Sequence, residues 1–436
     1  MTDALLTIIF LFSLFILLGS GVWVGLSLMG VAWISMALFT TRPAGDAMAT
    51  TVWGSLSSWT LTALPLFVWM GDILFRSRLS EDLFDGLSPW MGNLPGRLMQ
   101  TNVAGCAIFA AISGSSAATA VTIGKMSIPE LRKRKYPEMM IVGSLAGSGT
   151  LGLLIPPSII MIVYGVATDT SIAQLFIAGV LPGIMLAALF MGYIGIWSFL
   201  NSDKVPPNDI RMNFWQKLKA SKGLIPVGLL ILFVLGSIYG GYATPTESAA
   251  LGVVGALLLS WFQGTMNWRT FVDSLLGATK TSAMIMLILA GSSFLSLAMG
   301  FTGLPRNLAQ WIGELQLSPN QLIFALTVFF IILGCFLDGI SMVVLTMAVL
   351  LPMVQQAGFN LIWFGIFIVI VVEMAQITPP VGFNLFVLQG LTGHSIVYIA
   401  RAAAPYFLLM VAAVVLIVLF PEIATFLPSQ MTPVPR

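Results

Sequence analysis

Two short stretches of this sequence carry oxygen ligands and small side chains between apolar runs. The first is Ser113-Gly114-Ser115-Ser116 and the second is Asp338-Gly339-Ile340-Ser341. Hydroxyl groups and the carbonyls of unwound backbone are ligands for a hard cation such as sodium, and two related stretches indicate at least two sites. The hydroxyls expected to contribute belong to Ser113, Ser115, Ser116, Ser148, Thr150, Ser341 and Thr378.

The same stretches lie where half-helices are expected to begin, which favours binding of an anion. Free N–H groups and the partial positive charge of a helix N-terminus stabilise a nearby negative charge by about 0.3–1 kcal/mol. Several converging N-termini therefore predict a site for an anion that needs no arginine. The residues expected at this site are Ser116, Thr119, Pro156, Pro157, Ser341, Pro379 and Pro380.

The apolar runs beside the first stretch are too short to cross a bilayer. They cover about residues 98–112 and 117–128, whereas a spanning helix needs roughly 20 apolar residues. The runs beside the second stretch, about 321–337 and 341–353, have the same form. Each pair predicts a re-entrant hairpin, here called hairpin 1 and hairpin 2. Its tip must face protein or a water-filled cavity, because lipid cannot satisfy unpaired backbone groups.

A pair of prolines interrupts the long apolar run that follows each hairpin. The breaks are Ile155-Pro156-Pro157 and Thr378-Pro379-Pro380, and another proline follows the first proline of each break after 26 residues. Proline removes a backbone donor and ends the preceding helix, but it is well placed to start a new one. Two broken helices are therefore expected opposite the hairpins.

Simpler interpretations exist for some of these residues. Serine and glycine also serve as small residues where membrane helices pack closely, but the repeated pattern opposite two Pro-Pro breaks favours a binding site. Ionisable residues inside apolar runs are candidates for function. Asp338 is expected either to ligate a cation or to cap the following half-helix, and Glu373 either to function or to pair with a neighbouring helix.

Composition excludes several classes of function. The 436 residues are 58% hydrophobic and 8% charged, against about 25% charged residues in a soluble domain, so the chain is a polytopic membrane protein. A net charge of +2 does not support nucleic-acid binding, and one histidine with two cysteines cannot form a zinc site. Cys106 and Cys335 fall in apolar runs and are expected to be small buried hydrophobic residues.

The predicted fold is an all-α polytopic membrane protein with an inverted repeat. No positive charge precedes residues 4–18, which are expected to form a retained transmembrane helix rather than a signal peptide. Each half has about five crossings and one hairpin, and an odd number inverts the second half. Basic residues beside hairpin 1 and in the connector place these segments in the cytoplasm and both termini in the periplasm.

The expected boundaries follow from these runs. The first repeat is expected at 1–200, with hairpin 1 at about 94–131 and a broken helix at about 138–167. A basic cytoplasmic connector follows at 201–222. The second repeat is expected at 223–436, with hairpin 2 at about 319–355 and a broken helix at about 360–391.

These motifs resemble those of the large membrane subunit of the tripartite ATP-independent periplasmic (TRAP) transporters. The matching stretches are FAAISGSSAATAVTIGKMSIPELRKRKYP from Phe109, LGLLIPPSIIMIVYGVATDTSIAQLFIAGVLPG from Leu151, YGGYATPTESAALGVV from Tyr239, FLDGISMVVLTMAVLLP from Phe336 and QITPPVGFNLFV from Gln376. The resemblance implies an elevator-type architecture of the ion-transporter kind, with a scaffold and a moving domain that holds both hairpins. It implies sodium-coupled import of a small organic acid across a bacterial inner membrane, with Na⁺ as coupling ion and no other cofactor.

The resemblance also implies two protein partners and a set of sodium ligands. The partners are a small four-helix membrane (Q) subunit and a periplasmic substrate-binding (P) protein, which delivers the organic anion to the permease in the lipid bilayer. Sodium sites in that family lie at the hairpin tips against the broken helices. Carried over to this chain, they fall on Ser113, Gly114, Ser115 and Ser116 with residues 148–156, and on Asp338, Gly339 and Ser341 with Thr378.

Other functions stay open at this point. A stand-alone organic anion symporter of similar architecture, coupled to sodium or protons, would need no binding protein. Proton coupling through Asp338 and Glu373 is a further option. An intramembrane enzyme is disfavoured, because the sequence offers no paired nucleophile and base, and because an inverted repeat serves alternating access rather than hydrolysis.

Overall fold

The computed structural model describes residues 3–207, 212–302, 318–334, 337–379 and 382–431. Every regular element in these ranges is a helix, which confirms the predicted all-α class. Six of the described helices are long and apolar enough to cross a membrane, and the number rises to eight if each of two bent pairs is one span. The chain is thus a multi-pass membrane protein.

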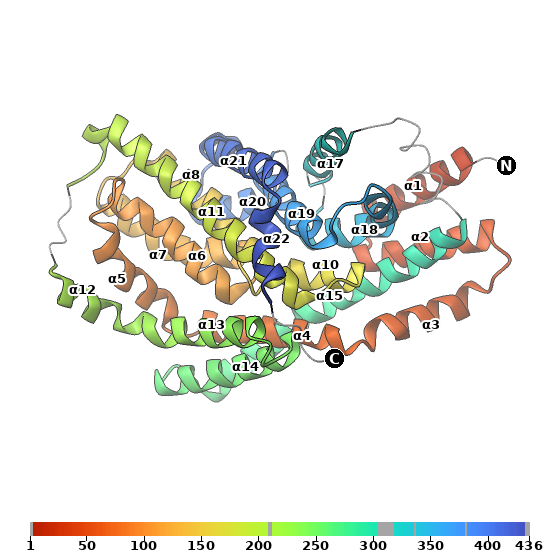
Figure 1. Ribbon diagram of the computed structural model, residues 1–436, viewed down its shortest axis with the longest axis horizontal. Helices are drawn as coiled ribbons and strands as arrows, with labels where there is room; N and C mark the ends of the chain where they lie inside the picture. Colours follow the sequence, from red (N-terminus) through yellow and green to blue (C-terminus); the bar gives the residue numbers. More distant parts are fainter. Residues whose placement is uncertain (1–2, 208–211, 303–317, 335–336, 380–381, 432–436) are drawn as a thin grey trace.

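The first half begins with helices at one end of the molecule (Figure 1). A bend of 58° separates α3 from the segment that contains α4. The elements up to hairpin 1 are α1 (Asp3–Gly19), α2 (Val24–Phe39), α3 (Ala44–Leu56), η1 (Trp59–Thr62), α4 (Ala63–Phe75), α5 (Leu79–Met91) and η2 (Arg97–Met99).

Hairpin 1 consists of α6 (Gln100–Ser113) and α7 (Ser116–Lys133). Gly114 joins them with a φ of +58°, a left-handed conformation that glycine adopts without steric cost. The side chain of Ser115 then accepts a hydrogen bond from the N–H of Ala118 and caps α7. The helix of the second arm extends beyond the apolar run at 117–128, because its basic last turn leaves the apolar environment.

The first broken helix follows, and α11 returns from it. It comprises α8 (Glu138–Gly149), α9 (Leu151–Leu154) and α10 (Ile159–Thr168), with a bend of 41° at the Pro-Pro break. Ser158 caps α10, accepting from the N–H of Met161. The return helix α11 spans Ile172–Leu200.

The second half is also built of helices in its described residues. The connector contains η3 (Ser202–Lys204) and the surface helix α12 (Phe214–Ala220), and η4 (Ser221–Gly223) leads into the second half. Thr244 and Glu247 form a capping box at the start of α14. The helices are α13 (Leu224–Tyr239), α14 (Pro245–Phe262), α15 (Trp268–Thr302), α17 (Pro319–Leu333), α18 (Gly339–Gln356), α19 (Leu361–Gln376), α20 (Phe383–Thr392), α21 (Ile396–Leu419) and α22 (Glu422–Ser429).

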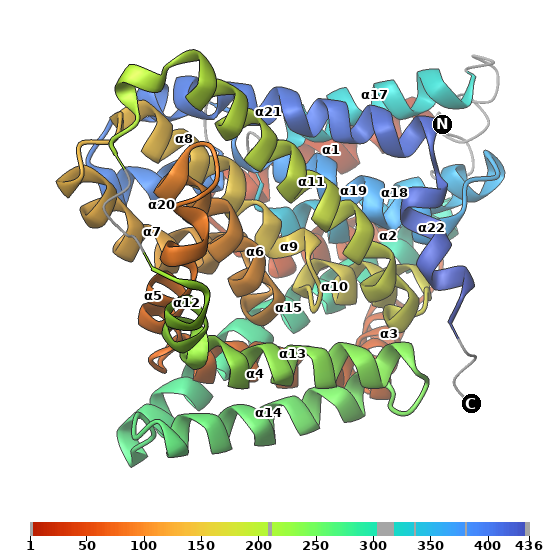
Figure 2. The ribbon, with the colours of Figure 1, turned by 60° about the vertical axis from the view of Figure 1, so that its left-hand side comes forward.

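Helices α10 and α19 lie in the middle of the molecule, and α13 and α14 form one outer edge (Figures 1 and 2). Every residue of α19 from Trp363 to Gln376 is buried, as expected for a helix that is apolar on all sides. The outer helices instead expose large apolar side chains such as Leu232 and Phe262, as a membrane-facing surface requires. Cys106 is fully buried in α6, as predicted, whereas Cys335 lies outside the described residues.

Candidate functional site

The hydroxyls at the tip of hairpin 1 form a compact cluster. The Ser113 and Thr119 hydroxyl oxygens are 2.8 Å apart. Thr119 donates a hydrogen bond to the carbonyl of Ser115 at 2.8 Å, and the N–H of Ser115 donates to the Ser113 hydroxyl at 3.4 Å. The fold therefore brings together three of the residues that the sequence nominates, at the N-terminus of α7.

The tip of hairpin 1 lies directly against the first broken helix. The N–H of Ile159, at the start of α10, donates to the carbonyl of Gly114 at 3.4 Å. A Cβ atom at Gly152 would lie 2.5 Å from the carbonyl oxygen of Ser115, so only glycine permits this approach. Pro156 and Pro157 lie within this break, and a Cβ atom at Gly114 would lie 2.8 Å from the carbonyl oxygen of Pro157. Two half-helix N-termini, those of α7 and α10, are thus next to each other.

Two of the nominated hydroxyls on the first broken helix are used by their own helix. Ser148 donates to the carbonyl of Ser144 at 2.6 Å and contacts the sulfur of Cys106. Thr150 donates to the carbonyl of Gly147 at 2.6 Å. In this arrangement neither hydroxyl donates a hydrogen bond to the hairpin 1 tip, but each keeps oxygen lone pairs that can contact a cation.

At the tip of hairpin 2, Asp338 acts as the N-cap of α18. Its Oδ2 atom accepts hydrogen bonds from the N–H groups of Ile340 at 3.1 Å and Ser341 at 3.2 Å. The Ser341 hydroxyl donates to Oδ1 of the same carboxylate. The capping alternative is thus realised, and the carboxylate keeps further lone pairs for a ligand. Thr378, at the second break, donates to the carbonyl of Met374 at 2.7 Å.

The second Pro-Pro break is described only in part. Pro379 ends the described segment that follows α19, and Pro380, which the sequence assigns to the anion site, lies outside the described residues.

Gln376 contacts both hairpins, although the sequence-based list of site residues does not include it. Its Oε1 atom accepts a hydrogen bond from the hydroxyl of Ser116 at 3.0 Å. Its Nε2 atom would lie 2.5 Å from a Cβ atom at Gly339, so the amide packs directly on the tip of hairpin 2. Gln376 is only 3% exposed. The sequence feature that could have identified Gln376 is a polar amide side chain near the end of a largely apolar run, just before the Pro-Pro break.

Glu373 lies one turn earlier on α19 and is buried. It is 1% exposed and lies near the Ser116 hydroxyl and the Leu153 backbone. Neither carboxylate oxygen makes a hydrogen bond of good geometry within the described part of the chain. The alternative of an ion pair with a neighbouring helix is therefore not seen there. Because a buried carboxylate is costly, this group marks a place where a proton or a cation would be stabilised.

Glu138 pairs across the two halves at the basic end of hairpin 1. Its Oε1 atom lies 2.9 Å from Nε2 of His394, and it also pairs with Arg132 at the end of α7. A solvated surface histidine is expected at position 394, and the structure instead holds it in this cluster, half-buried. Lys125 is exposed, as expected for a lysine that extends towards the membrane surface.

Comparison with known proteins identifies the family. Residues 11–423 match the family described as "Tripartite ATP-independent periplasmic transporter, DctM component". The chain is 32% identical over 374 residues to the C4-dicarboxylate TRAP transporter large permease protein DctM of Pseudomonas aeruginosa, covering 86% of this chain and 87% of that protein. It is 31% identical over 417 residues to the isethionate TRAP transporter permease protein DctMQ of Oleidesulfovibrio alaskensis, covering 95% of this chain and 65% of that protein.

A solved structure shares the fold. The YdaH transporter of Alcanivorax borkumensis, described as having an unusual topology, aligns with a TM-score of 0.62 over 93% of this chain and 96% of its own, at 13% sequence identity. At this identity the likeness concerns the fold alone. The family match covers nearly the whole sequence and agrees with the resemblance of its motifs. The chain therefore belongs to the DctM component, or large permease, family of the tripartite ATP-independent periplasmic transporters.

Proposed function

We propose that this chain is the permease of a sodium-coupled importer of a small organic anion, working by an elevator motion. Membership of the family makes it a secondary transporter component and not an enzyme. The observation that carries the proposal is the position of Gln376, which contacts the tips of both hairpins from the end of the second broken helix. In the proposed inverted repeat, this contact brings corresponding elements of the two halves together, which supports an alternating-access mechanism.

Two sodium sites are proposed at this meeting point. The first uses oxygen atoms of Ser113, Gly114, Ser115 and Ser116 with carbonyls of residues 148–156, and the second uses Asp338, Gly339, Ser341 and Thr378. Support comes from the packing of the hairpin 1 tip on the first broken helix and from the buried Glu373 carboxyl group near Ser116, whose oxygens make no hydrogen bond of good geometry among the described residues. Sodium is the coupling ion, and no other cofactor is proposed.

The anion is proposed to bind at the half-helix N-termini. The N-termini of α7 and α10 adjoin through the contact between Ile159 and Gly114, and each stabilises negative charge by about 0.3–1 kcal/mol. The residues proposed to contribute at helix N-termini are Ser116 and Thr119 in α7 and Ser341 in α18. The proposed site also includes the prolines that precede two other helices, which are Pro156 and Pro157 before α10 and Pro379 and Pro380 before α20. The two relatives described above are named for a C4-dicarboxylate and for isethionate, which are organic acids, and a small organic acid is accordingly proposed as substrate.

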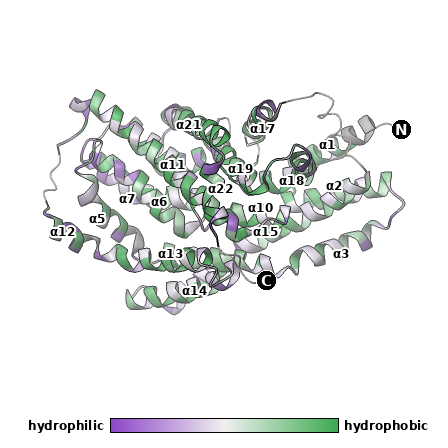
Figure 3. Cartoon of the chain, viewed as in Figure 1, coloured by the Kyte–Doolittle hydropathy of each residue, from purple (hydrophilic) through white to green (hydrophobic). Residues whose placement is uncertain are grey.

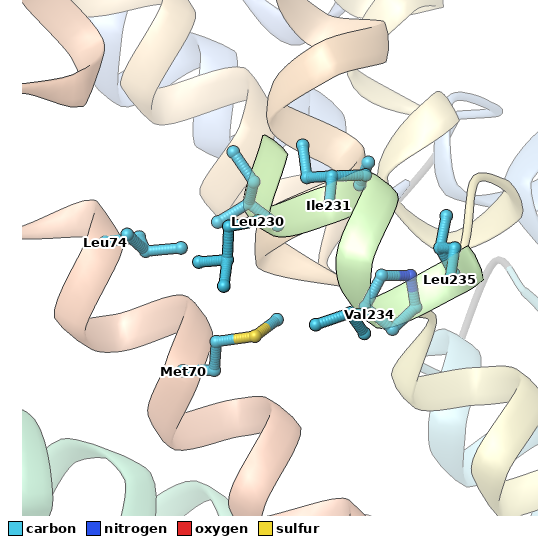
Figure 4. A pocket seen from close by; sticks show the side chains of 9 residues that line it. Met70, Leu74, Leu230, Ile231, Val234 and Leu235 are labelled. Atoms are coloured by element: carbon cyan, nitrogen blue, oxygen red, sulfur yellow. The ribbon is translucent and has the colours of Figure 1, made fainter. Parts of the chain in front are cut away.

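The elevator motion is proposed to slide hairpin 1 past α4 and α13. A cavity of about 10 Å³ lies between these helices, α6 and Pro157, and its lining residues are all apolar (Figure 4). Met70 and Leu74 of α4 face Leu230 and Val234 of α13 across it. We propose that this apolar lining allows the helices to slide, because apolar contacts are not directional.

Partners and location follow the family. TRAP large permeases work with a periplasmic binding protein and a small membrane subunit. For this chain we propose that the small subunit is a separate four-helix protein, that the binding protein delivers the anion, and that the complex lies in a bacterial inner membrane. The proposed orientation places both termini in the periplasm, with the basic end of hairpin 1 and the connector in the cytoplasm.

Uptake by proteoliposomes tests the proposal. The permease is reconstituted with the small subunit encoded beside it and supplied with the binding protein encoded there, loaded with its organic acid. Uptake is expected only with an inward sodium gradient and with the binding protein present. Equal uptake in a potassium gradient would contradict sodium coupling, uptake driven by a pH gradient alone would favour protons, and uptake of free substrate without the binding protein would identify a stand-alone symporter.

A further inference from the structure

A cavity opens where the second arm of hairpin 1 meets the connector that follows α11. The connector passes the end of α7 in both views of the ribbon (Figures 1 and 2), and hydrophilic residues gather at this end of α7 (Figure 3). The cavity measures about 760 Å³, within the range of about 300–1,000 Å³ typical of small-ligand pockets. Three prolines line it together with Lys133, Arg134, Lys135, Lys204, Glu130 and Asp203.

The lining carries an excess of positive charge. Nε of Arg134 lies 2.8 Å from Oε1 of Glu130, so these two charges offset each other. Three lysines then face a single carboxylate, that of Asp203, which leaves two positive charges in excess. Lys204 donates a hydrogen bond to Oδ1 of Asn201 at 3.1 Å, and no ion pair within 4.0 Å joins any of the three lysines to a carboxylate in the described ranges.

The backbone holds both walls of this cavity in place. Lys135 has a φ of +63° at the end of α7, a position where glycine is favoured, and the N–H of Tyr136 closes the turn on the carbonyl of Leu131 at 3.0 Å. On the other wall, the guanidinium of Arg97 donates to the carbonyl of Pro206. Arg97 also has a positive φ, of +51°. Strained, non-glycine backbone of this kind clusters at ligand-binding positions.

We propose that this cavity binds a phosphate-bearing anion, and that the anion is the headgroup of a lipid with two phosphates, of the cardiolipin class. Basic pockets between membrane helices on the cytoplasmic side suit such headgroups. The two positive charges in excess match the two phosphodiester groups, and the prolines offer an apolar ledge for the glycerol carbons. A bound headgroup would bridge the end of hairpin 1 and the connector.

The full-length permease in detergent tests this site. Native mass spectrometry measures its affinity for cardiolipin and for phosphatidylcholine, and inorganic phosphate is added as competitor. The triple variant Lys133→Gln, Lys135→Gln, Lys204→Gln is compared with a matched triple, Lys219→Gln, Lys222→Gln, Lys280→Gln, which makes the same change of charge outside the cavity. Lys135→Gly removes one charge and suits the left-handed turn, so it separates binding from folding.

The cavity triple is expected to lower the affinity for cardiolipin at least about tenfold, while the matched triple keeps it. Lys135→Gly is expected to weaken cardiolipin binding without lowering the melting temperature. Competition by millimolar inorganic phosphate would identify a soluble phosphate compound as the occupant of the same site, and the absence of competition supports the lipid. Equal losses in the two triples, equal affinity for phosphatidylcholine, or an unchanged affinity in the cavity triple would overturn the proposal.

Discussion

The hydroxyl of Ser116 donates a hydrogen bond to the side-chain carbonyl of Gln376, 260 residues further along the chain, at 3.0 Å. Ser116 is the first residue of α7 in hairpin 1, and Gln376 is the last residue of α19 in the second broken helix. The amide nitrogen of Gln376 also packs on Gly339 of hairpin 2. One buried side chain thus connects the two repeats at the level of both tips.

Replacing Gln376 by leucine is expected to weaken sodium binding. The change keeps the volume but removes the acceptor that orients the hydroxyl of Ser116, a proposed sodium ligand. A hydrogen bond of this kind contributes about 0.5–1.5 kcal/mol, and to the extent that only the sodium-bound state depends on this orientation, the sodium concentration for half-maximal uptake should rise by up to about tenfold, since about 1.4 kcal/mol is a factor of ten. The measurement is sodium-dependent uptake in proteoliposomes. Gln355→Leu, an exposed glutamine at the far end of α18, serves as control, and equal behaviour of the two variants would refute a role for the contact.

Replacing Glu373 by glutamine is expected to affect sodium binding and the stability of the protein in different ways. The variant replaces a buried carboxyl group, whose oxygens make no hydrogen bond of good geometry in the described ranges, by an amide that cannot become charged. The melting temperature in sodium-free buffer should therefore be maintained or rise, because no cost of burying a charge can arise at this position. If the carboxylate favours a nearby cation, the half-maximal sodium concentration should rise at the same time. A lower melting temperature with unchanged sodium dependence would instead indicate a purely structural role.

The sequence predicts the helices of this protein better than their contacts. The run at 172–200 coincides with α11 because polar residues bound it on both sides, and Thr244 with Glu247 marks the start of α14 through local hydrogen bonds. The polar stretches at the hairpin tips are equally local signals. Hydrophobic periodicity and helix capping depend on residues that are close in sequence, so helix positions and polar hairpin tips can be predicted from the sequence alone.

The contacts of Gln376 and His394 could not be predicted in the same way. Whether Gln376 faces Ser116 depends on how α19 is rotated against hairpin 1, and an apolar helix that is buried on all sides has no amphipathic face to fix that rotation. His394 pairs with Glu138, 256 residues away, through the packing of the α20–α21 turn on α8. Both contacts are products of tertiary structure.

Asp338 offers a way to distinguish capping from cation binding. Asp338→Ala removes the cap of α18 and should lower stability by about 0.5–2 kcal/mol, whereas asparagine caps about as well as aspartate. Asp338→Asn should therefore keep the melting temperature but raise the sodium requirement, because the charge is lost. Ser116→Ala should raise it as well, and Lys125→Ala, at an exposed position, should not. If only Asp338→Ala impairs uptake and also lowers the melting temperature, Asp338 acts as a cap alone.

Gly114→Ala is expected to disrupt the tip of hairpin 1. Its φ of +58° is unfavourable for alanine by about 1–2 kcal/mol, and the new Cβ atom would lie 2.8 Å from the carbonyl oxygen of Pro157. The tip must then move away from the first broken helix, which lengthens the contact between Ile159 and Gly114. Uptake should fall sharply and the melting temperature should drop.

Gly228→Ala in α13 is the control, because nothing lies within 4 Å of the added Cβ atom. It should leave uptake unchanged and raise stability by up to about 1 kcal/mol, since alanine has a higher helix propensity than glycine. Similar losses in both variants would show that the left-handed turn and its contact with Pro157 are not what makes position 114 sensitive.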